Sequence, residues 1–440
     1  MLRDLRVLLV TAGTLATFLA AVAWQAPPAS DAPGRLPVLR AAGPRWYRGN
    51  LHTHSLWSDG DDFPEMIADW YRGHGYDFLG LSDHNVLSDG ERWVPAAGKP
   101  ARETAVRKYL DRFGAAWVER REVKGEGQVR LKPLAEFRSL LEEPGKFLLI
   151  PAEEITTAYQ KAPVHVNAVN LRDPIKPIVG PDVTETIRVN HRQVAEQAKK
   201  TGRPMFAFLN HPNFGWGVRG EEMIEADELG FFEVFNGHPS VNNEGDITHP
   251  DTDRLWDITL AVRLGRLGRG PVFALGTDDA HNYHARGFKQ ANPGRGWVMV
   301  RAPYLTAEAI VAAMRRGDFY ASSGVTLDDV ATADGELRLA IRGEPGVTYH
   351  TEFVATLRGA RLDSTPRADA NGKPLPVTRV YDNAIGQTVA TATGLTPRYK
   401  LTGNELYVRA RVRSSKPHPN PYRKGQVEMA WTQPVVPAAR

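Results

Sequence analysis

The chain has no cysteine among its 440 residues. Disulfide bonds, thiolate metal ligands and cysteine nucleophiles are therefore excluded, and stability has to come from the hydrophobic core and from any bound metal. A marked excess of one charge is also lacking, since 55 basic residues face 51 acidic residues and leave a net charge of +4. Because the sequence has no basic run of the kind that follows a phosphate backbone, no nucleic-acid partner is expected.

A long apolar run without charges lies at the N-terminus, from Val7 to Ala23, behind a segment that contains Arg3 and Arg6. This pattern is typical of a secretory signal peptide, and Ala21-Val22-Ala23 offers a cleavage site of small residues. An uncleaved membrane anchor is the alternative, because an apolar stretch of about 18 residues can span a bilayer. We therefore expect an exported protein, periplasmic or secreted, with residues 1–23 as signal peptide or anchor and no other membrane span.

The composition changes along the chain and predicts two domains. Residues 24–44 are rich in Pro, Ala and Gly, as expected of a linker. From 45 to 327 short apolar runs alternate with amphipathic stretches, which is typical of β/α units around a parallel sheet or barrel. A charged stretch at 92–146 is longer than a usual connection and predicts a partly helical insertion over the barrel mouth. Residues 328–440 alternate in polarity and predict a small β-sandwich-like domain.

Signals for individual helices and strands support this division. The sequence predicts helices at Pro64–His74, Thr184–Lys200, Thr252–Leu267 and Thr306–Arg316. Short buried strands, rich in branched and aromatic residues, are predicted at 78–81, 147–150, 164–169, 206–209, 231–235 and 272–275. Antiparallel strands are predicted in the C-terminal part at 336–341, 349–357, 378–381 and 406–412.

Side chains of the types that bind metals follow several of these strands directly. They are Asp83-His84, Glu153-Glu154, His211 and the segment Thr277-Asp-Asp-Ala-His281. In a parallel barrel the carboxyl ends of all strands lie on one face, so we expect residues far apart in the sequence to converge in one pocket. His165 can join them from its own strand.

The strongest single motif is Asn50-Leu-His-Thr-His-Ser-Leu-Trp-Ser-Asp-Gly60. His52 and His54 are two positions apart on an extended segment, so they point to the same side and can chelate one ion. The following turn brings Asp59 back toward them. A lone His-x-His pair is common without a metal, but four further strand ends carry ligand-type groups, so a metal site is predicted.

In their order along the chain, these motifs resemble those of the PHP family, the polymerase and histidinol phosphatase superfamily of metal-dependent phosphoesterases. The resemblance covers about residues 48–324 and rests on His52-Thr-His54, Ser58-Asp59-Gly60, Ser82-Asp-His-Asn85, Glu153-Glu-Ile155, Val164-His-Val166, Asn210-His-Pro212 and Asp279-Ala-His281. It implies an α/β fold with a distorted seven-stranded β/α barrel, which holds two or three divalent ions of zinc, manganese or iron.

The resemblance also implies which side chains bind these ions. The ligands would be His52, His54, Asp59, His84, Glu153, His165, His211, Asp279 and His281. The family ends on an Asp-x-His step, which fits Asp279, although the adjacent Asp278 is an open alternative. Asp83 and Glu154 are expected to orient histidine ligands through their second ring nitrogen.

The expected function is that of a metal-dependent hydrolase, most specifically a phosphoesterase acting on a small phosphorylated substrate. The nucleophile would be a hydroxide that bridges the ions, formed near neutral pH because metal coordination lowers the pKa of water. Arg286 and Lys289, in the loop after His281, are candidates for stabilising a phosphate, and a solvated loop charge is the alternative for both.

Two other functions stay open. A carboxylic or carbamate ester hydrolase can use the same cluster, and a non-catalytic envelope protein would only bind the metals. The complete ligand set argues against the latter, because buried charged ligands are costly to keep without a function. The segment Phe235-Asn236-Gly237-His238 either lines the site or forms a turn. His191, His249 and His284 are expected on the surface.

Overall fold

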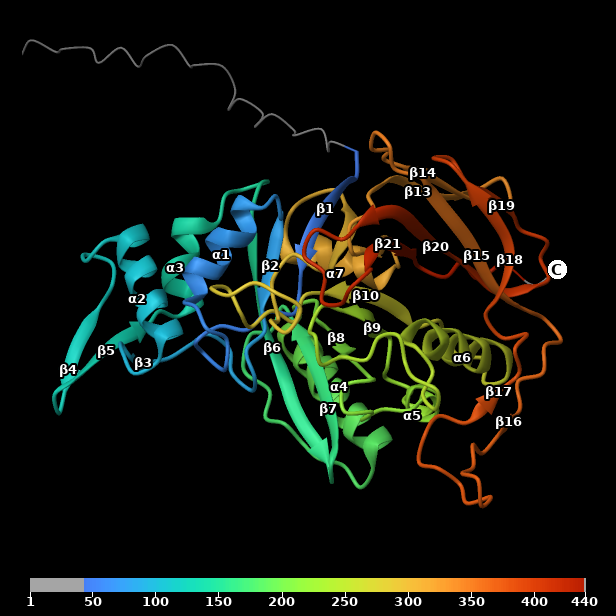
Figure 1. Ribbon diagram of the computed structural model, residues 1–440, viewed down its shortest axis with the longest axis horizontal. Helices are drawn as coiled ribbons and strands as arrows, with labels where there is room; N and C mark the ends of the chain where they lie inside the picture. Colours follow the sequence, from blue (N-terminus) through green and yellow to red (C-terminus); the bar gives the residue numbers. More distant parts are fainter. Residues whose placement is uncertain (1–42, 439–440) are drawn as a thin grey trace, which may run out of the picture. The chain divides into compact units, whose positions relative to one another are not determined.

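A mixed sheet organises the computed structural model, which describes residues 43–438 (Figure 1). Its first nine strands are β1 (Arg45–Asn50), β2 (Phe78–Leu81), β6 (Leu148–Tyr159), β7 (Ala162–Val169), β8 (Phe206–Leu209), β9 (Phe231–Asn236), β10 (Phe273–Thr277), β11 (Trp297–Ala302) and β12 (Phe319–Ser322). They follow the order β10-β9-β8-β7-β6-β2-β1-β11-β12. The predicted signal peptide or anchor and most of the predicted linker lie outside the described residues. No helix within the described range is long and apolar enough to cross a membrane.

The sheet is parallel only in part. Strands β1, β2 and β6 are parallel to one another, and so are β8, β9 and β10. Between these two groups β7 is antiparallel to both of its neighbours. The predicted strand at 164–169 therefore exists, but it does not have the parallel direction that we expected. The reason is its short connection to β6 through Gln160 and Lys161, because so short a link allows only an antiparallel pair.

Helices cover the sheet; the one at 220–225 was not predicted, and the others named here were predicted to within two residues. The helices are α1 (Pro64–Gly73), α4 (Val183–Thr201), α5 (Gly220–Glu225), α6 (Thr252–Gly265) and α7 (Ala307–Arg315). Helix α7 begins after Thr306, whose hydroxyl accepts a hydrogen bond from the backbone N–H of Ala309. Helix α4 begins in the same way after Asp182 and ends at Gly202, which adopts the left-handed conformation that glycine allows.

The insertion forms a small layer of its own. It contains β3 (Arg92–Pro95), α2 (Pro100–Phe113), β4 (Arg120–Val123), β5 (Glu126–Leu131) and α3 (Leu134–Leu141), with the strands in the order β3-β5-β4. The insertion is therefore partly helical, as predicted. It packs on the start of α1, where the rings of Phe63 and Tyr109 stack 4.2 Å apart and the Tyr109 hydroxyl donates to Glu65.

The C-terminal part is built of strands; the four predicted at 336–341, 349–357, 378–381 and 406–412 are present, and five others were not predicted. The strands are β13 (Leu327–Ala333), β14 (Glu336–Ile341), β15 (Tyr349–Leu357), β16 (Ser364–Thr365), β17 (Val380–Tyr381), β18 (Gln387–Thr393), β19 (Arg398–Lys400), β20 (Glu405–Pro417) and β21 (Val427–Thr432). Strand β21 pairs with β12, so the main sheet continues through β21-β20-β15-β18 to a total of 13 strands. The domain boundary at residue 328 stays a prediction, but no break in the sheet marks it.

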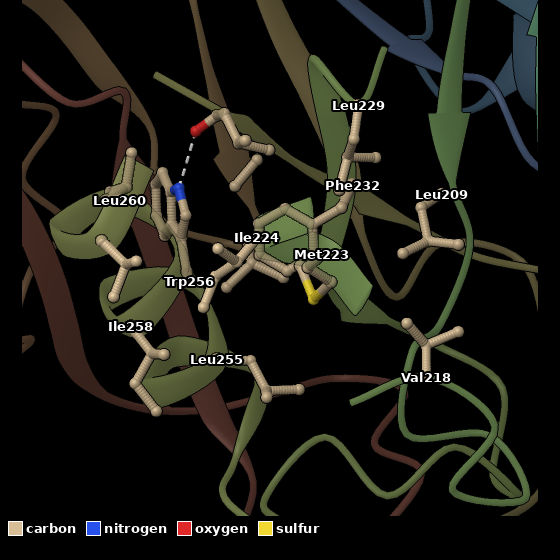
Figure 2. Close-up of a cluster of buried hydrophobic side chains, with 14 of the residues drawn as sticks. Leu209, Val218, Met223, Ile224, Leu229, Phe232, Leu255, Trp256, Ile258 and Leu260 are labelled. Atoms are coloured by element: carbon tan, nitrogen blue, oxygen red, sulfur yellow. Dashed lines mark hydrogen bonds between the residues drawn. The ribbon is translucent and has the colours of Figure 1, made fainter. Parts of the chain in front are cut away.

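A buried cluster between α5, α6 and the strands β8 and β9 holds this half of the sheet in place (Figure 2). Phe232 of β9 and Trp256 of α6 are fully buried, and the Trp256 indole donates to the Val272 carbonyl at 2.8 Å. Burial of one such large apolar side chain stabilises the fold by roughly 1.5–3 kcal/mol. Because β8, β9 and β10 are fixed by this packing, the residues at their carboxyl ends are fixed as well.

Candidate metal centre

Histidines and carboxylates from six strands meet at one place. His52 and His54 follow β1, His84 follows β2, His211 follows β8, and the segment from Asp278 to His281 follows β10, while Glu154 and His165 lie within β6 and β7. Four overlapping groups have potential ligand atoms within 4.8 Å of one another: His54, Asp59, His84 and His281; His52, His54 and Glu154; His52, His211 and Asp279; and His84, Glu154 and His165. The structure thus brings together eight of the nine residues that the resemblance implied as ligands, all except Glu153.

The innermost donors are spaced like ligands of one ion. The Nε2 atom of His52 lies 3.3 Å from Oδ1 of Asp279 and 3.5 Å from Oε2 of Glu154, and Nε2 of His54 lies 3.2 and 3.3 Å from the same two oxygens. All four side chains are buried. Two ligands bound about 2.0–2.1 Å from a tetrahedral zinc ion are about 3.3 Å apart, so this spacing fits a shared ion.

Unpaired polar atoms support the same interpretation. Nε2 of His52 and Nε2 of His54 are buried and have no hydrogen-bond partner among the described residues, and the buried Oε2 of Glu154 lies beside them and 2.8 Å from Nδ1 of His84. Buried polar atoms without a partner cost free energy, and they are rare unless an ion or water completes the site. The three atoms point to one another, so the residues present fit a divalent cation.

A second group of donors reaches the protein surface. Asp59 lies 3.4 Å from Nε2 of His281, 3.6 Å from Nε2 of His84 and 3.7 Å from Nδ1 of His54. The Asp59 side chain is 57% exposed, whereas His54 is buried. This group therefore forms the end of the cluster that solvent and a substrate can reach.

Glu154 connects the remaining histidines to the innermost donors. Its Oε1 lies 2.9 Å from Nδ1 of His165 and 3.5 Å from Nε2 of His211, while its Oε2 belongs to the innermost group. Asp279 is shared in the same way, with Oδ2 3.9 Å from Nε2 of His211. Two carboxylates that each face two groups are the arrangement expected when several cations lie close together.

Of the pair Glu153 and Glu154, the structure places in the cluster the residue that was not expected to be a ligand. Glu154 lies in the cluster, whereas Glu153 points to the other face of β6 and accepts a hydrogen bond from the Ile175 backbone at 2.8 Å. Successive side chains of a strand alternate between its faces, so only one of the pair can reach the site. Burial raises the pKa of Glu153 to about 7.

Asp83 also has a different role from the expected one. Its carboxylate does not orient a histidine but accepts hydrogen bonds from the Ser55 backbone and hydroxyl, both at 2.7 Å, and from the Ser58 hydroxyl at 2.6 Å. These contacts fix the turn that carries Asp59 back to His54. Asp83 therefore shapes the loop of the first motif.

Asp278 and Asp279 differ in their surroundings, and only Asp279 belongs to a group of potential ligand atoms. Asp278 is occupied, because it accepts hydrogen bonds from the Tyr71 hydroxyl and from the backbone N–H groups of Gly294, Arg295 and Gly296. Asp279 enters the cluster from a left-handed backbone conformation with φ of 49°. A non-glycine residue in that region is strained by about 1–3 kcal/mol and persists only where its surroundings hold it, as is common at functional sites.

Glu233 is the principal site residue that the sequence analysis missed. Its Oε1 lies 2.7 Å from Nδ1 of His52 and accepts from the Thr277 hydroxyl, and its Oε2 accepts from the His211 backbone and from the Asn236 amide. With Nδ1 donating to Glu233, the Nε2 atom of His52 is left to face the cluster. The available signal was a glutamate inside the apolar run Phe231-Phe-Glu-Val-Phe235, since a buried charged residue needs a partner.

The cluster shifts the pKa values of its members in opposite directions. Burial lowers the pKa of His52, but the charges of Asp279, Glu233 and Glu154 overcome this effect and hold it well above its usual value. Burial, together with the charge of His281, lowers the pKa of His54 to about 3. These two histidines are two positions apart, and they differ because carboxylates surround His52, whereas His54 also lies beside the charges of His281 and His84.

The carboxylates of the cluster are held in the ionised form. Burial acts to raise the pKa values of Glu154 and Asp279, but the charge of His52 outweighs it and both pKa values lie well below their usual range. For His84 burial acts to lower the pKa, and hydrogen bonds with Asp59 and Glu154 raise it to about 10. The site thus strongly favours positive charge at its centre, as a cation-binding site requires.

Cations beside the site come from the insertion and not from the expected loop residue. Arg286 is exposed and lies over the Trp70 ring, 5.7 Å from its centroid, which fits a solvated loop charge. In contrast, Lys108 of α2 donates to Nδ1 of His284 at 3.0 Å, and half-buried Arg102 lies near Asp61. Asp61 donates its backbone N–H to the carbonyl of His281, so α2 approaches the open end of the cluster.

The other histidines are less exposed than expected. His191 is buried in α4 with its ring against the Ile187 carbonyl, and His284 and His249 are half-buried. The segment 235–238 does line the site, because Asn236 donates to Asp279 at 3.1 Å and the His238 ring lies beside that of His281.

No protein-family model and no curated protein matches the chain. Nine chains of solved structures are similar to it, among them the following two. The first is a two-domain protein from Bacteroides vulgatus, described as containing a predicted PHP-like metal-dependent phosphoesterase. The sequence identity is 14%, the match covers 89% of this chain and 96% of that chain, and the TM-score is 0.38. The second is a protein from Bifidobacterium adolescentis whose assignment as a metal-dependent phosphoesterase is inferred. The sequence identity is 14%, the match covers 53% of this chain and 87% of that chain, and the TM-score is 0.27.

Proposed function

We propose that this protein is a metal-dependent hydrolase, and more specifically a phosphoesterase that cleaves a small phosphorylated substrate. The observation that carries the proposal is the convergence of the unpartnered Nε2 atoms of His52 and His54 with the carboxylates of Glu154 and Asp279. A hydrolase of this kind needs several cations at the end of a cleft that water and substrate can enter. Exposed Asp59 at one side of a buried centre fits that need.

The residues would hold two or three divalent ions of zinc, manganese or iron, in a distorted seven-stranded barrel of the PHP kind followed by a β-sandwich-like domain. Glu154 and Asp279 would be shared between neighbouring ions, and Asp59, His84 and His281 would hold the ion nearest to solvent. When bound, such ions polarise the ester and lower the pKa of water. Glu233 keeps Nε2 of His52 directed at the centre, and Asp83 keeps the Asp59 loop in place.

Phosphate is favoured over a carboxylic or carbamate ester by the motif resemblance and by the positive charge that α2 supplies. Arg102 and Lys108 lie near Asp61 and His284, on the side where the cluster is open. A cation at the mouth stabilises an anionic substrate more than a neutral one. A protein that only binds metal gains nothing from an open, partly exposed end of the cluster.

The proposal is tested by assaying the metal-loaded protein in parallel against nitrophenyl phosphate, its diester and nitrophenyl acetate. We expect turnover of a phosphate ester that is lost on chelation and restored by metal. Turnover of the acetate alone would favour the carboxylic ester alternative, and turnover of none of the three would favour a non-catalytic protein. Elemental analysis of the same preparation should find at least two equivalents of transition metal, because one ion uses only four to six ligands.

The place of action is also a proposal and rests on the sequence alone. The N-terminal pattern of Arg3, Arg6 and the apolar run to Ala23 favours export, with the substrate met outside the cytoplasm. Fractionation of cells that express the full chain, with N-terminal sequencing of the product, would distinguish a cleaved signal peptide from an anchor.

A further inference from the structure

His238 lies beside the metal centre without being part of it. Its ring centroid is 5.4 Å from that of His281, with the rings at 71°, and 6.4 Å from that of Phe214. None of the four groups of potential ligand atoms includes it. The side chain is half-buried, so the ring faces both the cluster and the space in front of it.

The hydrogen bonds of His238 determine where its proton lies. The backbone N–H of Ser240 donates to Nδ1 at 3.1 Å, and a backbone N–H can only donate. Nδ1 must therefore be the unprotonated nitrogen, and the proton of the ring lies on Nε2. Nε2 forms no hydrogen bond with the described residues, so a donor beside the cluster has no partner from the protein.

The backbone that carries His238 is held on several sides. Asn236 accepts from the His238 N–H at 2.8 Å, and its own amide donates to both Glu233 and Asp279. Gly237 donates to the Thr277 carbonyl at 2.9 Å, and a Cβ atom at this position would lie 2.9 Å from the Asp278 carbonyl. Such a fixed backbone suits a group that must act at a defined position.

We propose that His238 binds an oxygen of the substrate, donating a hydrogen bond from Nε2 to the oxygen on which negative charge develops. The proposal rests on the hydrolase function proposed above. As a neutral donor His238 transfers no proton, because losing the Nε2 proton would leave an imidazolate anion. Its action is electrostatic, in the way that a donor fixed beside an oxyanion stabilises it. The chemical class that it recognises is a phosphoryl or acyl oxygen.

A role in packing alone is the alternative, and two substitutions separate the two roles. His238→Phe keeps the ring and removes the donor, whereas His238→Gln places an amide N–H near the position of Nε2. His249→Phe is the matched control, because His249 belongs to the same loop and stacks on Trp216 at 3.9 Å, away from the groups of ligand atoms.

Binding of inorganic phosphate to the metal-loaded protein, measured by calorimetry, tests the donor without requiring turnover. We expect His238→Phe to weaken binding by roughly tenfold to a hundredfold, since a hydrogen bond to a charged group is lost. His238→Gln should recover most of this loss, and His249→Phe should bind like the unaltered protein. Metal content should be equal in all four proteins.

Equal phosphate binding by His238→Phe and the unaltered protein would overturn the proposal, and so would a loss that His238→Gln does not reverse. An unaltered protein that binds metal but not phosphate would overturn it as well. Turnover of the best ester is measured on the same samples. If phosphate binding depends on His238 while no ester is cleaved, the function proposed above fails and the role of His238 stands.

Discussion

Nδ1 of His52 and Oε1 of Glu233 lie 2.7 Å apart, and both side chains are fully buried. Each oxygen of Glu233 accepts two hydrogen bonds. Oε1 accepts from the His52 ring and the Thr277 hydroxyl, and Oε2 accepts from the His211 backbone N–H and the Asn236 side-chain amide. The carboxylate therefore fixes the orientation of two histidines of the cluster at once. Glu233 lies within β9 and contacts His52 through Nδ1, and it belongs to none of the four groups of potential ligand atoms.

This pairing predicts that Glu233→Gln weakens metal binding. An amide in place of the carboxylate turns one acceptor into a donor, so an N–H group must face two other donors. We expect a loss of about 10–100-fold in metal affinity, the usual effect of removing a partner of a metal-bound histidine. Competition with a chelator of known affinity measures it. Glu65→Gln, at another buried glutamate, is the control, and equal affinities in all three proteins would contradict the role of Glu233.

The positions of Glu153 and Glu154 on opposite faces of β6 predict opposite outcomes for two neighbouring substitutions. Glu154→Gln should lose at least one equivalent of metal, because Glu154 faces two groups of potential ligands. Glu153→Gln should keep its metal, since Glu153 only accepts from Ile175. Metal content is counted by elemental analysis after equal reconstitution. The reverse result would restore the assignment made from the sequence.

Substitution of the innermost donors should stop turnover altogether. His52→Ala and Asp279→Ala each remove a ligand of the shared ion and the charge stabilisation it supplies, a loss of several kcal/mol in the transition state. Arg286→Ala should change kcat and KM little, because Arg286 lies exposed over Trp70. Steady-state kinetics on the best ester decide this. Near-normal turnover and metal content in His52→Ala would refute the site.

Glu65 predicts a dependence of stability on pH. Burial raises its pKa from 4.5 to about 7, with a weaker opposing effect of the hydrogen bond from Tyr109. The folded state thus holds this proton more tightly than the unfolded state, so stability falls as pH rises from about 5 to about 8.

Glu65→Gln should remove this part of the dependence. Relative to the unaltered protein, the variant should gain roughly 2–3 kcal/mol in free energy of unfolding across that range. Urea titrations at several pH values measure the difference. A difference that does not change with pH would show that Glu65 is ionised in the folded protein.

The shared sheet predicts that the C-terminal part cannot be removed. A chain that ends at Thr326 would expose the edge of β12, which pairs with β21. It would also lose Gln433, whose side-chain amide accepts a hydrogen bond from the backbone N–H of Ala274 in β10 and donates one to the Ala274 carbonyl. It would also lose Arg409, which forms a buried ion pair with Asp257 of α6. We expect aggregation of the truncated chain, since an unpaired edge strand favours association. Gel filtration and thermal unfolding measure this, and a soluble, metal-binding truncation would show that the first domain is independent.

Local signals in the sequence were sufficient for the longer helices on the main sheet, but not for the short α5. Pro64, Thr306 and Gly317 mark starts and stops whose physical basis lies within one turn of helix, so α1 and α7 were placed to within two residues. The strand at 164–169 was found for the same reason, through its branched residues. Its direction was wrong, because direction depends on pairing with distant segments and not on local preference.

The sequence by itself determined which kind of site could be predicted for this protein. Histidines and carboxylates after apolar runs predicted a metal site, and eight of the nine expected ligands lie together in the structure, because strand ends carry their next residues to a common edge. Only the tertiary structure decided the rest. Glu154 lies in the cluster and Glu153 does not. Asp279 lies in the cluster, whereas Asp278 is bonded to Tyr71, and Glu233 contacts Nδ1 of His52. Each of these depends on which face of a strand is turned inward and which donors are already paired, and both are set by contacts between segments far apart in the chain.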